Sequence, residues 1–240
     1  MEVLIDAFNL ILYQPLFNAL ILFYEYLPGH DFGIAVIVLT VLIRFILYPL
    51  MTQSTKSQKV LSGLQPKIQE IQGKYKNDKE KQSRAIMELY QKEKINPFGG
   101  CLPLLIQLPI LIALYQVFLK GFQPEAMAGL YSFVPYPGVI NPIFLGLINL
   151  AESSLILAIL AAVVQFFQSK MVMPPSSKKQ VKGKDQMAQF SGIMQKQMLY
   201  FFPIFTFFIL TRLPAALGIY WIVTSVFSIA QTHFIFKKND

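Results

Sequence analysis

Long apolar runs separated by polar segments dominate the chain. A helix needs about 20 mainly apolar residues to cross the hydrocarbon core of a bilayer. Five runs approach or reach this length, over 32–53, 97–120, 154–173, 194–211 and 215–236. The fourth contains Pro203, which membrane bundles tolerate because neighbouring groups satisfy the backbone that proline frees. The pattern predicts an all-α membrane protein built as a five-transmembrane-helix bundle.

Residues 1–31 have a different pattern. Their apolar side chains recur at helical spacing, while polar side chains interrupt the other face. The apolar set is Leu4, Phe8, Leu12, Leu16, Leu20 and Phe23, and the polar set is Asp6, Asn9, Gln14 and Asn18. We predict an external amphipathic segment that lies on the membrane. A short first transmembrane helix is the alternative, and it would place both chain ends on the same side.

Residues 54–96 predict a cytoplasmic antiparallel helical hairpin. The first arm has the three-four spacing of a coiled-coil seam, and the returning arm carries a matching apolar stripe. These positions are Leu61, Leu64, Ile68, Ile71 and Tyr75, then Ile86, Leu89 and Tyr90. Its basic exterior suits anionic lipid headgroups, ribosomal RNA or a protein partner. The alternative is that this charge only fixes the topology.

The distribution of Lys and Arg orients the chain. Segments 1–31 and 121–153 contain neither residue, whereas 54–96 and 174–193 are rich in lysine. By the positive-inside rule, the N-terminus is outside and the C-terminus inside. We therefore expect 121–153 to be an external loop with an interfacial segment and 174–193 a flexible basic cytoplasmic loop. Residues 237–240 would form a short cytoplasmic tail.

Composition narrows the function classes. Hydrophobic residues make up 54% of the chain and charged residues 14%, which is unusual for a soluble domain of this size. Cys101 is the single cysteine, and His30 and His233 lie far apart, so we expect no disulfide and no metal site. The sequence has no phosphate-binding loop, nucleophile and base pair, or carboxylate pair. We therefore expect no enzyme activity, no catalytic residue and no cofactor.

Arg44 interrupts the first apolar run and is the most informative residue. A guanidinium at the centre of a membrane helix costs about 2.5–3.5 kcal/mol on insertion scales, so it should face a polar cavity inside the bundle. Polar residues at helical spacing on three runs predict the walls of a groove. They are Thr40 beside Arg44, Gln165 and Gln168 on the third run, and Trp221, Thr224, Ser225 and Ser228 on the fifth. Alternatively, the hydroxyl residues only hold helices together.

Segment 96–115 begins with Asn-Pro-Phe-Gly-Gly and continues as an apolar run, and it is one of several distinctive segments, with 33–50, 65–67, 74–79, 167–171, 202–207 and 217–221. Together these segments resemble the YidC/Oxa/Alb family of membrane protein insertases, and 96–115 is similar to the family's second core helix. The resemblance implies a five-helix core around a hydrophilic groove, open to the cytosol and to lipid but closed outside. By motif match, Arg44, Gln168 and Trp221 are groove positions. The arginine would attract the polar or acidic tail of an incoming substrate.

The resemblance also implies partners and a location. We expect an insertase and chaperone that acts on nascent membrane proteins in the bilayer of the bacterial cytoplasmic (inner) membrane. The ribosome, the signal recognition particle pathway and the Sec translocon are further candidate partners, with no specific nucleic acid expected beyond ribosomal contact. We expect neither the large external domain of many Gram-negative relatives nor tight ribosome binding through a long basic tail.

Two other function classes fit a polar membrane bundle. A small-solute transporter that uses Arg44 as an anion site would predict repeated halves and a second deep charge, and the sequence shows neither. A noncatalytic scaffold for membrane complexes is the other alternative.

Overall fold

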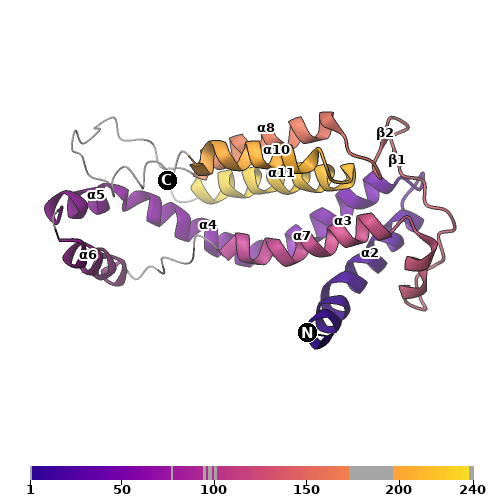
Figure 1. The fold of residues 1–240 in the computed structure, drawn as a ribbon, viewed down its shortest axis with the longest axis horizontal. Coiled ribbons are helices and arrows are strands. Elements are labelled where there is room, and N and C mark those ends of the chain that lie inside the picture. The colour runs from indigo at the N-terminus through magenta and orange to yellow at the C-terminus, as the bar shows by residue number, and fades with distance from the viewer. Residues whose placement is uncertain are drawn as a thin grey trace.

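A computed structural model of the chain describes residues 2–76, 78–93, 96, 99, 102–172 and 197–237. The predictions for 174–193, Cys101 and 238–240 concern residues outside these ranges. Most described residues are helical, and the long helices of the bundle run roughly along one direction (Figure 1). A helical hairpin lies at one end of the bundle, and a pair of short strands lies at the other (Figure 1).

The elements of the first half are α1 (Glu2–Phe8), the π-helix η1 (Asn9–Tyr13), α2 (Gln14–Tyr26), α3 (Phe32–Ile46), α4 (Tyr48–Gly63), α5 (Gln65–Lys74) and α6 (Lys79–Lys92). The elements of the second half are α7 (Leu102–Lys120), the 3-10 helix η3 (Pro124–Gly129), β1 (Ile143–Phe144), β2 (Ile148–Asn149), α8 (Leu155–Val172), the π-helix η4 (Gln197–Phe201), α10 (Phe202–Leu210) and α11 (Ala215–Lys237).

Helix α11 lies at the centre of the bundle. It packs against α8, α3, α4 and α7, and α8 packs in turn against α10. The approach of α11 to α8 depends on a small residue, because a Cβ atom at Gly218 would lie 3.0 Å from the Cβ of Leu157. Buried residues such as Leu114, Ala158 and Leu217 join these helices in one apolar core. Helix α11 is thus the element that most of the other long helices contact.

Two described helices, Glu2–Tyr26 and Ala215–Lys237, are long and apolar enough to cross a membrane. The pair α3 and α4 is a third candidate, although it is bent by 66°. The remaining apolar helices are shorter, over Leu105–Lys120, Leu155–Met171 and Leu199–Leu210. Among the residues described, length and composition therefore support two spans, or three if the bent pair is one. The count of five stays a prediction.

The bend between α3 and α4 divides the run over 32–53, for which the pattern predicts one helix. Helix α3 ends at Ile46, and Pro49 occupies the first turn of α4. Proline lacks a backbone N–H and clashes with the preceding turn, so a helix tolerates it best at its start. The Gln231 amide of α11 holds the bend, since its Nε2 donates to Tyr48 O at 3.1 Å and Thr52 Oγ1 at 2.9 Å.

Helices α5 and α6 pack against each other as the predicted hairpin arms, at the end opposite the strands (Figure 1). Leu64 and Ile68 of the predicted seam are buried, but the seam is not continuous because α4 ends just before Leu64. Gln82 Nε2 donates to Gln72 O at 3.1 Å across the two arms. The cytoplasmic location of this hairpin stays a prediction.

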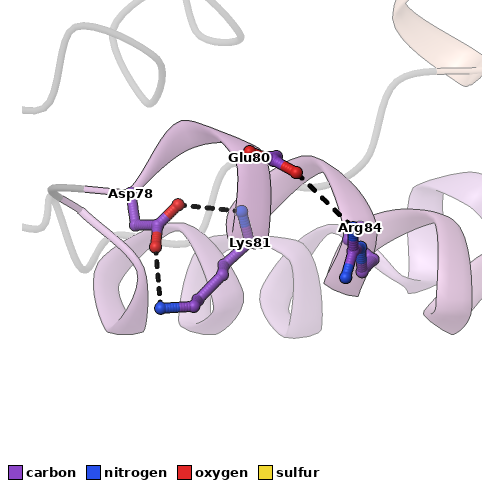
Figure 2. A network of polar contacts seen from close by, with 4 residues as sticks. All are labelled: Asp78, Glu80, Lys81 and Arg84. Atoms are coloured by element: carbon purple, nitrogen blue, oxygen red, sulfur yellow. Dashed lines mark hydrogen bonds and ion pairs between the residues drawn. The ribbon is translucent and has the colours of Figure 1, made fainter.

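Asp78 starts α6 by capping its first turn. Figure 2 shows its carboxylate facing both the backbone and the side chain of Lys81, at 3.0 Å from Lys81 N and 2.9 Å from Lys81 Nζ. The hydrogen bond from the Lys81 backbone N–H, together with the lysine ammonium, lowers the pKa of Asp78. One turn further, Glu80 and Arg84 form an exposed ion pair at 3.4 Å (Figure 2).

Helix α2 differs from the expected amphipathic pattern, because its buried face includes the polar Asn18. Asn18 Nδ2 donates to Gly129 O at 3.1 Å, and Asn18 Oδ1 accepts from Tyr131 N at 2.6 Å. The amide therefore ties α2 to the segment after η3 instead of facing solvent. Since Glu2–Tyr26 is long enough to span a bilayer, the interfacial and spanning placements both stay predictions.

Residues 143–149 form a small β-hairpin within the predicted all-α fold. β1 and β2 are antiparallel, with Ile143 opposite Asn149 and Phe144 opposite Ile148. Helix α8 follows, and its first turn is capped by Ser154, whose Oγ accepts from Leu157 N at 3.4 Å. Helix α8 begins at Leu155, and the assignment of 154–173 as a membrane span stays a prediction.

Replacing Asn18 by Ala should destabilise the protein. Two backbone groups would lose their partners in a buried site, and each such loss costs about 1–3 kcal/mol. We expect the Asn18→Ala variant to unfold at a lower temperature than wild type in detergent. The unfolding can be followed by a fluorescent dye that does not react with cysteine, or by light scattering. Gln53→Ala, at an exposed position on α4, is the control. Equal unfolding temperatures for the two variants would show that the Asn18 bonds contribute nothing.

Replacing Asp78 by Ala should speed amide hydrogen exchange in the first turn of α6, whereas Asp78→Asn should retain the cap. Glu80→Ala, which removes the neighbouring exposed carboxylate, should leave this exchange unchanged. Because the pKa of Asp78 is lowered in the folded hairpin, its stabilising contribution exists above the ordinary aspartate pKa. It should disappear as the pH falls through the lowered value, and protection that persists at still lower pH would contradict this.

Candidate functional site

Arg44 lies in the last turn of α3 and is buried, with 6% of its surface exposed. The apolar residues around it form the helix, but a guanidinium in their midst needs polar partners. Its Nη2 donates to Gln107 Oε1 of α7 at 3.2 Å. In the part of the chain that the structure describes, no carboxylate forms an ion pair with it. Arg44 is thus a buried cation with a neutral partner.

Gln107 connects Arg44 to α11. Its Nε2 donates to the hydroxyl of Tyr220, which is 2% exposed. Thr224 lies one turn further along α11, and its buried Oγ1 has no hydrogen-bond partner among the described residues. Residues from α3, α7 and α11 therefore form one polar chain inside an apolar bundle.

A second polar pair joins α11 to α8. Trp221 Nε1 donates to Gln165 Oε1 at 3.1 Å. Because consecutive helical residues point in directions about 100° apart, Tyr220 and Trp221 reach different neighbours from the same turn. Gln168 lies on the following turn of α8 and is half-buried. Helix α11 thus carries a polar contact to α7 and another to α8 at the same level.

Two hydroxyl residues of the predicted stripes bond to their own helices, whereas the buried Oγ1 of Thr224 has no hydrogen-bond partner among the described residues. Thr40 Oγ1 donates to Val36 O at 2.6 Å, and Ser228 Oγ donates to Thr224 O at 2.9 Å. Thr40 and Ser225 are each 1% exposed, and Thr224 is 8% exposed. Bonds of this kind satisfy the hydroxyl locally and leave it less available to a ligand. The amides, the guanidinium and the unsatisfied Thr224 hydroxyl are therefore the groups most able to bind a polar guest.

The structure joins Gln165 to Trp221, both predicted groove positions, and links the predicted Arg44 to α7 and α11. It adds Gln107 and Tyr220, which the polar stripes do not include. Gln107 interrupts the apolar run 97–120. A polar amide in such a run is a candidate partner for a buried arginine, and this signal could have identified it. Tyr220 gives no such signal, because tyrosine is common in apolar helices.

The cluster can orient and bind a guest, but it offers no covalent chemistry. It contains a cation, amides, hydroxyls and an indole, and none of these forms a nucleophile and base pair. No group of three or more potential metal-ligating side chains occurs in the described segments. Its chemical capacity is therefore hydrogen bonding and attraction of negative charge.

Comparisons with known proteins agree with this architecture. A family model described as 60Kd inner membrane protein matches residues 22–240. The chain is 37% identical over 227 residues to the membrane protein insertase YidC of Geobacter metallireducens, covering 94% of this chain and 37% of that protein. It is 36% identical over 209 residues to YidC of Fusobacterium nucleatum, covering 87% of this chain and 88% of that protein.

A solved structure is similar as well. The crystal structure of an active YidC insertase with its first transmembrane domain resolved has a TM-score of 0.59 and 27% identity to this chain. The match covers 97% of this chain and 50% of that one, so the chain spans about half the length of its solved relative. Because the family model and these relatives cover nearly all of its residues, the chain belongs to the YidC/Oxa/Alb family of membrane protein insertases.

Proposed function

We propose that this protein inserts membrane proteins into the bilayer and helps them fold, using a hydrophilic groove open to the cytosol and to lipid. Arg44 would attract the translocated tail of the substrate. The observation that carries the proposal is the buried Arg44 guanidinium with a neutral hydrogen-bond partner. A cation without a carboxylate partner keeps its capacity to bind negative charge, and in a partly buried site that attraction is stronger than in water.

The geometry around Arg44 supports this role. A guanidinium has five N–H donors, and the Gln107 bond accounts for a single one of its nitrogens. A carboxylate can engage two parallel donors of an arginine, which gives direction as well as attraction. Gln107 would hold the guanidinium in place without neutralising it. Gln168, Gln165, Trp221 and the hydroxyls of α11 would line the rest of the groove.

The energetic task explains why a polar groove is useful. A short polar tail that crosses the hydrocarbon core exposes backbone and side-chain groups, and each unsatisfied group costs several kcal/mol. A groove with amide and guanidinium groups shortens the apolar part of that path. Burial of the substrate's apolar segment in lipid would supply the driving force, assisted for acidic tails by the membrane potential.

The proposal extends to the orientation and the partners of the chain. The relatives described above are bacterial and the matching family model is that of an inner membrane protein, which supports a bacterial membrane location. We propose that its N-terminus lies outside and its C-terminus inside, which places the α5 and α6 hairpin in the cytosol beside incoming substrates. The ribosome, the signal recognition particle pathway and the Sec translocon are proposed partners. The chain spans 37% of the Geobacter relative's length. That the chain has the insertase activity of this longer protein is therefore part of the proposal.

Purified protein in liposomes tests the function directly. A single-span substrate with a short acidic tail is added, and protection of that tail from external protease is measured. Wild type and Arg44→Lys should insert it, while Arg44→Ala should insert it far less. Arg212→Ala, which removes an exposed arginine of the turn between α10 and α11, is the matched control. Failure of folded wild type would instead favour a partner-dependent scaffold, or a transporter if solute moves.

Replacing Gln107 by Glu separates charge from shape at the same site. The new carboxylate would lie beside the Arg44 guanidinium and neutralise it, with little change in volume. At an effective dielectric constant near 20, unit charges about 4 Å apart interact by roughly 4 kcal/mol. Since about 1.4 kcal/mol is a tenfold change, insertion of an acidic tail should fall at least about tenfold.

The matched substrate for the Gln107→Glu variant carries Asn in place of each acidic tail residue. Insertion of this neutral tail should fall much less than insertion of the acidic tail. An equal loss for both tails would show that Gln107 acts through the shape of the groove and not through the charge of Arg44.

A further inference from the structure

The β1–β2 hairpin ends in an apolar tip. Leu145 is 61% exposed and Leu147 is 84% exposed, with Gly146 between them. Hairpin turns that face water usually carry Asn, Asp or Gly at these positions. Two strongly exposed leucines on a turn of three residues are therefore unusual for a surface in contact with water alone.

The backbone of the turn makes the choice of leucine more informative. Leu145 has φ 50°, and Gly146 follows with φ 73°. The left-handed region suits glycine or asparagine, whereas the Cβ of other residues comes close to a carbonyl oxygen there. Neither the backbone nor water favours leucine at position 145. An apolar environment around the tip would supply the missing reason.

The tip is held firmly at the start of α3. Asp31 Oδ1 accepts from Ile34 N at 3.0 Å and caps α3, while Asp31 Oδ2 accepts from Leu145 N at 2.7 Å. The ring of Phe144 packs onto Gly33 so closely that a Cβ there would clash with it. A single carboxylate thus fixes the height of the tip relative to the first turn of α3.

That height is the edge of the apolar bundle. Helix α3 is strongly apolar from Phe32 onward, and its polar cap Asp31 marks where the hydrocarbon region ends. Helix α8 begins at this same end (Figure 1), and its first residues Leu155 and Ile156 are exposed. The segment 121–153 contains no Lys or Arg. The leucine tip therefore lies at the same end of the bundle as exposed apolar residues of α8, in a segment with no cation that would hold it in water.

We propose that Leu145 and Leu147 insert into the lipid leaflet at this end of the bundle, between the headgroups and the upper acyl chains. The occupant of the surface is phospholipid, recognised by apolar contact and not by charge. The tip would fix the starts of α3 and α8 against the membrane surface. This inference rests on membership of a membrane protein family and is independent of the insertase activity.

Depth-dependent quenching tests the proposal in liposomes that contain the purified protein at a low ratio to lipid. Cys101→Ser removes the single cysteine, and Leu147→Cys then carries an environment-sensitive fluorophore. Glu125→Cys, on the exposed part of η3, is the aqueous reference. Ile159→Cys, on the exposed face of α8, is the acyl-chain reference. The unfolding temperature of each labelled protein is compared with that of the cysteine-free parent.

We expect the probe at Leu147 to emit at shorter wavelength than the probe at Glu125 and to resist quenching by iodide. It should be quenched most by lipids with a nitroxide near the headgroup, and the probe at Ile159 by a deeper nitroxide. Iodide quenching equal to that at Glu125 would overturn the proposal. Shielding from both iodide and nitroxide would overturn it too, because protein, such as a second copy of the chain, would then cover the tip.

Leu145→Asn provides a second test that does not disturb the turn, since asparagine suits the left-handed backbone. With the probe at Leu147, this variant should show more iodide quenching than its parent, because the tip has then lost its remaining leucine. Unchanged quenching would remove Leu145 from the proposed membrane contact.

Discussion

The hydrogen bond between Arg44 and Gln107 is the interaction on which the arrangement of the bundle depends. A guanidinium cannot lie among apolar helices without polar contacts, so α3 and α7 must approach at the level of Arg44. Because Gln107 also donates to Tyr220, α11 must approach at the same level. The apolar contacts of these helices are non-directional, and this polar chain selects one arrangement among the many that burial alone allows.

Helix α11 contacts other helices at several levels along the bundle. Tyr220 and Trp221 contact α7 and α8 through amides, and Gly218 allows α8 to approach closely. Three turns further, Gln231 bonds the backbone where α3 bends into α4. The same helix therefore positions the polar cluster and the arm that leads to the α5 and α6 hairpin. A displacement of α11 would therefore move both the polar cluster and this arm. A movement of the hairpin would in turn change the position of α11 and the surroundings of Arg44.

Sequence reasoning succeeded where one residue carried a large energetic penalty. The burial of Arg44 follows from the cost of a charge in a membrane helix, and the family prediction is confirmed by the matched relatives. The bend at Leu47 was missed because the apolar pattern continues across Pro49. The hairpin at 143–149 was missed because strands of two residues have no measurable periodicity.

The buried amides show the limit of periodicity most clearly. Asn18 belongs to a polar stripe by spacing, yet it is buried and bonded to residues more than a hundred positions away. No local pattern contains that information, since the partner groups are backbone atoms of a loop whose sequence is unremarkable. Gln107 is similar, because its partners lie on two other helices. An amide in an apolar helix indicates that a partner exists, but only the packing identifies it.

Position 107 holds a neutral glutamine where a glutamate could pair with Arg44, and the two residues have different effects on stability and on the charge of the site. A glutamate would pair with Arg44, and such a pair gains Coulomb energy, although burying two charges offsets much of that gain. The neutral amide gives up the ion pair and leaves the positive charge uncompensated among the described residues. A protein selected for stability alone has little reason to keep a buried cation in this condition. The neutral amide is therefore consistent with the proposal that the missing negative charge arrives with a substrate, since the cost of burying Arg44 would then become attraction for that substrate.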